Sequence, residues 1–141
     1  MEWYIKVFKN YANFEGRARR KEYWMYVLVN LGILIVSMNV GFLFMSFNTI
    51  VGMAFLVLVA LYLLAIIIPT IAVSVRRLHD LNMSGILVIM RFIPLLSYVF
   101  LILTMIDGTR GPNRYGPSPK YDFYTPPVRY VEYSNQQFNI K

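Results

Sequence analysis

Residues 76–85 read RRLHDLNMSG and separate two long apolar runs of the chain. The first run, residues 23–75, contains no Asp, Glu, Lys, Arg or His, and in the second, residues 86–106, the single charged residue is Arg91. A helix of a soluble domain presents a polar face to water, which neither run can do. About 20 apolar residues are enough to cross the hydrocarbon core of a bilayer. The pattern therefore predicts an all-α membrane protein.

The composition of the 141-residue chain supports this class and excludes others. Hydrophobic residues make up 57% and charged residues 15%, whereas soluble domains carry about 25% charged residues. The absence of cysteine excludes disulfides and thiolate metal sites. The formal charge of +7 comes from basic residues that flank the apolar runs, as topology signals do. We therefore expect no nucleic-acid partner, and one histidine with few carboxylates predicts no metal and no cofactor.

The run over residues 23–75 is too long for one span. Its most polar short interval is Ser46-Phe47-Asn48-Thr49, which predicts a turn between helices at about 23–45 and 50–75. We expect the second helix to continue through residues 76–80 as one turn at the membrane surface. Asn30, Ser37 and Gly41 share one face of the first helix, and small or weakly polar residues are what membrane helices place against each other.

Residues 86–106 are long enough for a third span, with Arg91 reaching back to the cytoplasmic interface. The alternative is a re-entrant hairpin bent at Pro94, with both arms too short to cross. We expect three transmembrane helices, with re-entry of the third as the alternative. The N-terminus is then cytoplasmic and the C-terminus periplasmic, whereas a re-entrant hairpin would return the C-terminus to the cytoplasmic side.

The two ends of the chain differ from its apolar centre. Residues 2–13 place their aromatic side chains at spacings of three and four, which is typical of an amphipathic helix lying in the headgroup region or on the protein's own surface. Residues 107–119 are dense in turn formers, and we expect the tyrosine-rich residues 120–141 to be extended or disordered. The predicted organisation is an interfacial helix and elbow over 1–16, a transmembrane domain over 17–106, and a loop and irregular tail over 107–141.

Three separated motifs carry a family resemblance. They are GRARRKEYW at residues 16–24, RRLHD at 76–80 with Ser84-Gly85, and GPNRYGP at 111–117. In this order around apolar helices, the chain resembles the DUF805 family of small bacterial inner-membrane proteins over roughly residues 3–119. The resemblance implies a multi-pass protein of the bacterial cytoplasmic membrane with no established biochemical activity. Arg91 departs from the family pattern, because that position is usually apolar.

The basic residues of these motifs suggest a binding site on the cytoplasmic face. Clustered guanidinium groups suit phosphate, since each can donate two parallel hydrogen bonds. The hypothesis is a pocket for an anionic lipid headgroup with Arg76 and Arg77 as principal donors. Its candidate residues are Arg17, Arg19, Arg20, Arg76, Arg77 and His79, with Glu22 and Asp80 as ion-pair partners and Asn113, Arg114 and Tyr115 as a third motif. The alternative is an internal network that serves only stability, in which Glu22 or Asp80 neutralises an arginine. Asp80 can pair with Arg76 one turn before it, although this cation-first order is the less favourable one.

Catalysis and transport are weaker hypotheses. His79 and Asp80 are neighbours about 100° apart around a helix, so they would not orient each other as a catalytic dyad. We therefore expect no enzyme activity, with a site around His79 and Asp80 as the enzymatic alternative. A subunit of an oligomeric solute or ion transporter is the alternative function, with Arg91 as the intramembrane charge. A scaffold role through the tail would require a protein partner.

Overall fold

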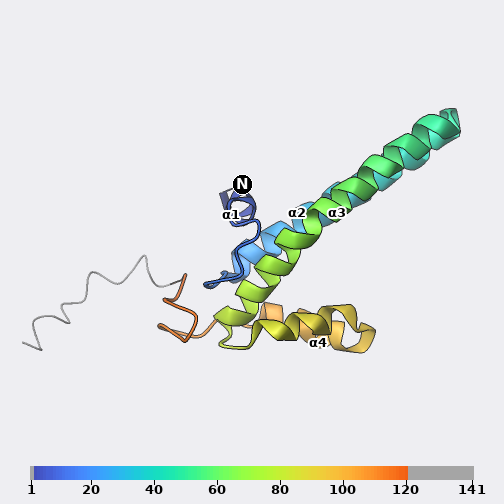
Figure 1. Ribbon diagram of the computed structural model, residues 1–141. Helices are drawn as coiled ribbons and strands as arrows, with labels where there is room; N and C mark the ends of the chain where they lie inside the picture. Colours follow the sequence, from blue (N-terminus) through green and yellow to red (C-terminus); the bar gives the residue numbers. More distant parts are fainter. Residues whose placement is uncertain (1, 121–141) are drawn as a thin grey trace, which may run out of the picture.

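The computed structural model describes residues 2–120, which form helices joined by short loops (Figure 1). The elements are α1 (Glu2–Lys9), α2 (Arg20–Phe47), α3 (Thr49–Asp80), the 3-10 helix η1 (Gly85–Phe92) and α4 (Pro94–Met105). The described residues contain no β-strand, only an isolated bridge between Asn113 and Gly116. The predicted all-α class is confirmed for this part of the chain. The predicted irregular tail beyond Lys120 lies outside the described residues.

Helices α2 and α3 form a long antiparallel hairpin that turns at Asn48. This residue is in an extended conformation, and its side-chain oxygen accepts hydrogen bonds from the backbone N–H groups of Ile50 (3.0 Å) and Val51 (3.2 Å). An asparagine in this position satisfies donors that the first turn of a helix leaves free. The predicted turn and the predicted extension of the second helix through residues 76–80 are both confirmed.

Polar and small residues join the two helices of the hairpin. The buried Asn30 donates to the backbone oxygen of Tyr26 and accepts from the hydroxyl of Tyr62 on α3. A Cβ atom at Gly41 would lie 2.6 Å from a methyl group of Leu56, so the two helices approach closely at this glycine. The prediction that Asn30 and Gly41 pack against a neighbouring helix is confirmed, and Ser37 is half-buried.

The outer surface of the hairpin is apolar and uncovered. Both α2 and α3 are long and apolar enough to cross a membrane, yet only 11% of the most apolar window of each is buried inside the protein. A core helix of a soluble protein would bury most of such a window. Exposed apolar surface of this extent needs a covering medium, and lipid is the one that suits two helices of spanning length.

Residues 85–105 do not form the straight third helix that we expected. The segment consists of η1, with 8 residues, and α4, with 12, and both are too short to cross a bilayer. The chain bends at Ile93, and α4 begins at Pro94, whose missing N–H costs nothing in the first turn of a helix. Figure 1 shows η1 and α4 leaving the base of the α2–α3 hairpin as a second, shorter hairpin. Two short arms joined by a bend beside Pro94 are the geometry of the re-entrant hairpin that we gave as the alternative to a third span.

Arg91 lies on η1 and faces the long hairpin. Its Nη1 atom donates to the hydroxyl of Tyr23 on α2 (3.2 Å) and to that of Ser74 on α3 (3.3 Å). The half-buried Arg91 therefore links η1 to both helices at the base of the long hairpin through two hydroxyl groups.

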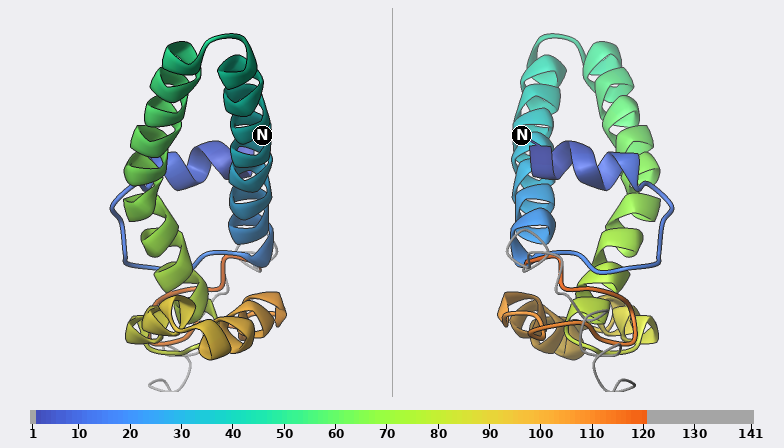
Figure 2. Two further views of the ribbon diagram at one scale, coloured as in Figure 1. Left: turned by 90° about the vertical axis from the view of Figure 1, so that its right-hand side faces the viewer. Right: turned by 90° about the vertical axis from the view of Figure 1, so that its left-hand side faces the viewer.

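The N-terminal helix α1 crosses the long hairpin on the side opposite η1 and α4 (Figures 1 and 2). The rings of Tyr4 and Phe8 pack on that of Tyr26, with centroids 5.9 and 6.0 Å apart, and the hydroxyl of Tyr11 donates to the backbone oxygen of Ala65. The aromatic face of this helix thus packs on the protein itself, which is the second of the two alternatives for this segment. The helix ends at Lys9, earlier than the predicted 13.

Residues 107–120 return to the end of the hairpin at which α2 begins and α3 ends. Arg17, just before α2, donates to the backbone oxygens of Thr109 and Gly111. Our expectation that the C-terminal segment lies across the membrane from the N-terminal segment is therefore wrong for residues 107–120. It assumed a third crossing, which the bend at Ile93 prevents.

Candidate functional site

The three sequence motifs meet at the base of the long hairpin, around the carboxylate of Asp80. Arg17 Nη2 lies 2.9 Å from Oδ1 of Asp80, and Arg77 Nη1 pairs with Oδ2. These side chains are nearly inaccessible, with exposed fractions of 1% for Arg17, 0% for Arg77 and 6% for Asp80. One buried carboxylate thus lies between two buried guanidinium groups, which leaves one positive charge in excess.

Backbone oxygens accept further hydrogen bonds from both guanidinium groups. Arg17 donates to the carbonyl oxygens of Thr109 (2.7 Å) and Gly111 (2.8 Å), and Arg77 donates to those of Thr104 (3.2 Å) and Ile106. The carbonyls at the end of α4 have no partner within their own helix, and a cation there also matches the helix dipole. Arg77 therefore anchors the end of α4, and Arg17 anchors the loop that follows it.

Gly108 is where this loop approaches Asp80 most closely. A Cβ atom added at Gly108 would overlap the carboxylate of Asp80, which Arg17 and Arg77 hold in place. We expect Gly108→Ala to destabilise the protein by about 1–3 kcal/mol, the usual cost of overpacking. Unfolding of the detergent-solubilised protein, followed by circular dichroism, measures the change. An unchanged free energy of unfolding in Gly108→Ala would contradict the close approach.

Arg76 forms a second buried ion pair on the α1 side of the hairpin. Its Nη1 atom lies 2.8 Å from Oε1 of the fully buried Glu22, and Lys6 of α1 lies 3.2 Å from the other carboxylate oxygen. Arg76 thus pairs with Glu22, one of the two carboxylates that the internal-network alternative named, and not with Asp80 one turn after it. Neighbouring arginines diverge by about 100° around a helix, so Arg76 stabilises the contact of α3 with α2, while Arg77 stabilises the contact of α3 with the end of α4. The Nε and Nη2 atoms of Arg76 are buried without a hydrogen-bond partner among residues 2–120.

His79 and the loop of the third motif pack against each other. The imidazole stacks on the ring of Tyr115, with centroids 3.7 Å apart and planes 6° from parallel, and its Nδ1 lies 3.2 Å from the backbone oxygen of Gly16. Asn113 donates to the backbone oxygen of His79 (2.9 Å), and Arg114 lies over the ring of Tyr115. The contacts of His79 thus join all three motifs. No group of His, Cys, Asp and Glu side chains within residues 2–120 is arranged to hold a metal ion.

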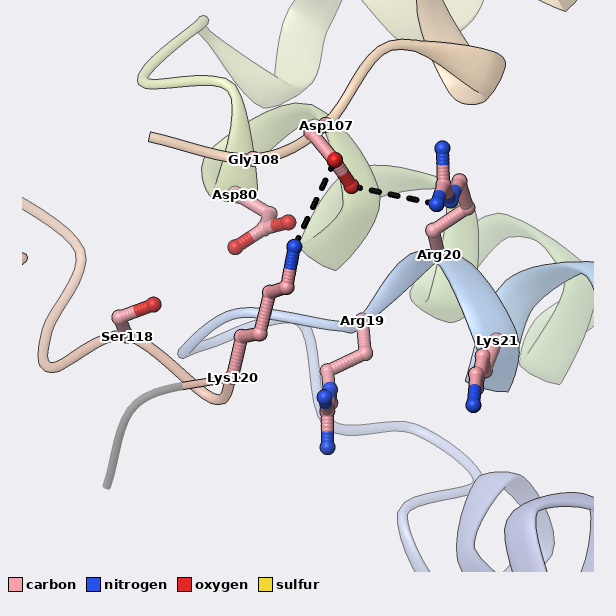
Figure 3. Close-up of a pocket in the computed structure, with 8 residues that line it drawn as sticks. All are labelled: Arg19, Arg20, Lys21, Asp80, Asp107, Gly108, Ser118 and Lys120. Atoms are coloured by element: carbon pink, nitrogen blue, oxygen red, sulfur yellow. Dashed lines mark hydrogen bonds and ion pairs between the residues drawn. The ribbon is translucent and has the colours of Figure 1, made fainter. Parts of the chain in front are cut away.

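A basic rim surrounds this buried network. Figure 3 shows its pocket, which is lined by Arg19, Arg20, Lys21, Asp80, Asp107, Gly108, Ser118 and Lys120. Asp107 lies 3.5 Å from both Arg20 and Lys120. Arg19 and Lys21 point away from Asp107 in this view. Arg19 contacts the ring of Trp3, 5.5 Å from its centroid, and Lys21 has no ion pair or hydrogen bond with any described residue.

The candidate residues therefore separate into two groups. Arg17, Arg76 and Arg77 are buried and bonded within the chain, so in this structure they are closed to a headgroup. Arg19 and Arg20 lie on the rim, where the sequence interpretation also placed them. It did not select Lys21, although this residue belongs to the same basic run, or Asp107 and Lys120, whose position depends on the return of the chain after α4.

The fold and the site together define a class: a small helical integral membrane protein with two helices of spanning length and a buried arginine–carboxylate network at one end. Within this class, residues 11–117 match the family described as "Protein of unknown function (DUF805)", and the chain belongs to that family.

Curated relatives from Escherichia coli K12 agree with this assignment. The inner membrane protein YhaI is 43% identical over 122 residues, which cover 86% of this chain and 98% of YhaI. The inner membrane protein YhaH is 39% identical over 125 residues, which cover 86% of this chain and 99% of YhaH. The uncharacterized protein YiiR is 28% identical over 131 residues, covering 74% of this chain and 84% of YiiR. No solved structure matches the chain significantly.

Proposed function

We propose that this protein is an inner-membrane module that binds anionic lipid headgroups at its cytoplasmic rim, with Arg19 and Lys21 as the principal contacts. The observation that carries the proposal is the difference between the two groups of cations. The buried arginines donate to acceptors within the chain, whereas Arg19 and Lys21 form no ion pair with a carboxylate of residues 2–120.

The position of these two cations favours an anion. They flank the first residue of α2, and no side chain caps that helix. The free N–H groups and the positive end of the helix dipole attract negative charge there. Each cation near an anionic membrane surface contributes about 1 kcal/mol of attraction. Trp3, which contacts both Arg19 and Lys6, adds an aromatic ring of the kind that is enriched at the membrane–water interface.

The proposal includes a topology. In it, α2 and α3 span the membrane, the basic residues 17–21 lie in the cytoplasm as the positive-inside rule requires, and residues 107–120 lie beside them. The η1–α4 hairpin enters only the cytoplasmic leaflet. The apolar side chains of this hairpin support its contact with lipid, because Phe92 is 68%, Leu95 78% and Tyr98 69% exposed. The inner-membrane location is supported by the names of YhaI and YhaH.

Native mass spectrometry of the purified protein with mixed phosphatidylglycerol and phosphatidylethanolamine tests the headgroup site. We expect Arg19→Ala/Lys21→Ala to weaken the retention of phosphatidylglycerol by on the order of tenfold, because two contacts of about 1 kcal/mol each are lost. The retention of the zwitterionic lipid should change little.

A charge-matched control separates a site from general attraction. Lys9→Ala/Arg110→Ala removes the same charge from two other exposed positions, and we expect it to change phosphatidylglycerol retention less than threefold. Equal losses in the two double variants would mean that net charge alone attracts the lipid, and the proposed site would be rejected.

A further inference from the structure

The outward face of α2 carries a heptad pattern that the fold does not use. Leu28, Gly32, Ile35, Asn39, Phe42 and Ser46 follow one another at spacings of four, three, four, three and four residues. All six are exposed, the large apolar ones by 55% (Leu28), 54% (Ile35) and 59% (Phe42). Figure 2 shows that, beyond the crossing of α1, α2 lies beside α3 alone. We call these six residues the α2 seam.

Every second residue of the α2 seam is small or polar, and these residues lie seven apart in the chain. Gly32, Asn39 and Ser46 form one row, and Leu28, Ile35 and Phe42 form the other. Rows that alternate in this way along a 3.5-residue repeat bring two helices together in a left-handed supercoil. Small residues in such a row let the backbones of membrane helices approach closely.

No close contact among residues 2–120 requires a glycine at position 32. A Cβ atom added there would meet nothing within 4 Å, whereas one at Gly41 would lie 2.6 Å from Leu56. Glycine inside a helix costs about 1 kcal/mol relative to alanine. A close approach by a helix of another molecule explains why glycine is present at a position that the fold leaves open.

Asn39 carries a polar group on the same open face. Its Nδ2 atom donates to the backbone oxygen of Ile35 (2.7 Å), and its side-chain oxygen has no hydrogen-bond partner among residues 2–120. Lipid cannot satisfy this oxygen, since the hydrocarbon core offers no donor. A carboxamide both donates and accepts, so the Asn39 side chains of two identical helices can satisfy each other across a twofold axis.

The exposed face of α3 shows the opposite composition. Its most exposed side chains include Ile50, Met53, Val57, Leu61 and Leu64, with exposed fractions of 56–79%. Large aliphatic side chains are suited to lipid, and the small residues exposed among them, Ala54, Ala60 and Ala65, carry no polar group. The contrast distinguishes α2 as the helix with a protein partner.

We propose that two copies of this chain associate in parallel through the α2 seam, with Asn39 paired to Asn39 near the middle of the membrane. The parallel arrangement follows from the pattern, because only equal depths bring the two Asn39 side chains and the two Gly32 backbones together. The dimer is independent of the headgroup site, which lies at the other end of α2.

Cysteine cross-linking tests the dimer directly, since the chain contains no cysteine of its own. We expect Ile35→Cys to form a disulfide-linked dimer when native membranes with low levels of the protein are oxidised. Ile33→Cys, two residues away at a similar depth, is also exposed (38%) but lies off the seam, and we expect it to give at most one-fifth of that yield. Equal yields from both variants would mean random collisions and would overturn the proposal.

Two further variants test the individual contacts. Asn39→Leu should weaken the dimer about three- to thirtyfold, the range that one hydrogen bond between membrane helices supplies. Gly32→Leu should remove most of the Ile35→Cys cross-link, while open space at this position leaves the monomer intact. Single-molecule photobleaching in dilute liposomes measures the dimer fraction. Unchanged dimer fractions in both variants would overturn the proposed seam.

Discussion

Replacing Asp80 by alanine is expected to destabilise the folded protein by about 3–5 kcal/mol, the usual result of removing one partner from a buried ion pair. Asp80 is the shared partner of Arg17 and Arg77, whose side chains are 1% and 0% exposed. Without the carboxylate, two buried guanidinium groups lie close together and repel each other. The backbone oxygens around them carry only partial charge, so the end of α4 and the following loop should detach first.

Unfolding in mixed detergent and SDS, followed by circular dichroism, measures this loss. Asp107→Ala is the matched control, because Asp107 also pairs with two cations but is 56% exposed. Exposed pairs contribute about 1 kcal/mol or less. A double variant, Asp80→Ala with Arg77→Met, should recover part of the loss, since an apolar side chain needs no counter-charge. Equal effects of Asp80→Ala and Asp107→Ala would contradict the burial of the network.

Glu22→Leu is expected to have a comparable effect on the other side of the hairpin. The carboxylate is fully buried and pairs with Arg76, whose side chain is 4% exposed. Its loss leaves a buried guanidinium in which Nε and Nη2 already have no hydrogen-bond partner among residues 2–120. We expect a destabilisation of about 3–5 kcal/mol and a weakened attachment of α1, because Lys6 loses the same partner.

A double-mutant cycle checks this second pair. Glu22→Leu/Arg76→Leu should be less destabilised than the sum of the single variants, because the residues in one ion pair do not act independently. Lys6→Met is the control, and its effect should be small since the Lys6 side chain is 46% exposed. Additive effects of Glu22→Leu and Arg76→Leu would mean that the pair does not contribute to stability.

The two long helices could be predicted from the sequence because their signals are local. The charge-free run has a length that fits two spans, and Asn48 marks the turn by a side chain that caps the next helix. The contact of Asn30 and Gly41 with a neighbouring helix follows from residue type and periodicity. These features do not depend on how segments distant in the sequence fold back onto the hairpin.

The details of the site could not be predicted, because they depend on the bend of the chain at Ile93, which is distant from Arg17 and Asp80 in the sequence. Once the chain bends at Ile93, the end of α4 and residues 107–116 reach Asp80. Arg77 and Arg17 then find backbone oxygens as partners, which no spacing of charged residues indicates. Spacing within the helix allowed Arg76 to pair with Asp80, whereas in the structure Arg76 pairs with the buried Glu22 of α2.

The central claim is that residues 107–120 lie at the same end of the α2–α3 hairpin as Arg17, so that the three motifs form one network. Single cysteines at Glu15, Phe47 and Arg110, all exposed positions of a chain without cysteine, test it most directly. In intact spheroplasts, a membrane-impermeant maleimide should label Phe47→Cys alone. Glu15→Cys and Arg110→Cys should become labelled together, only after lysis. Labelling of Arg110→Cys from the side opposite to Glu15→Cys would require a third crossing and would contradict the network.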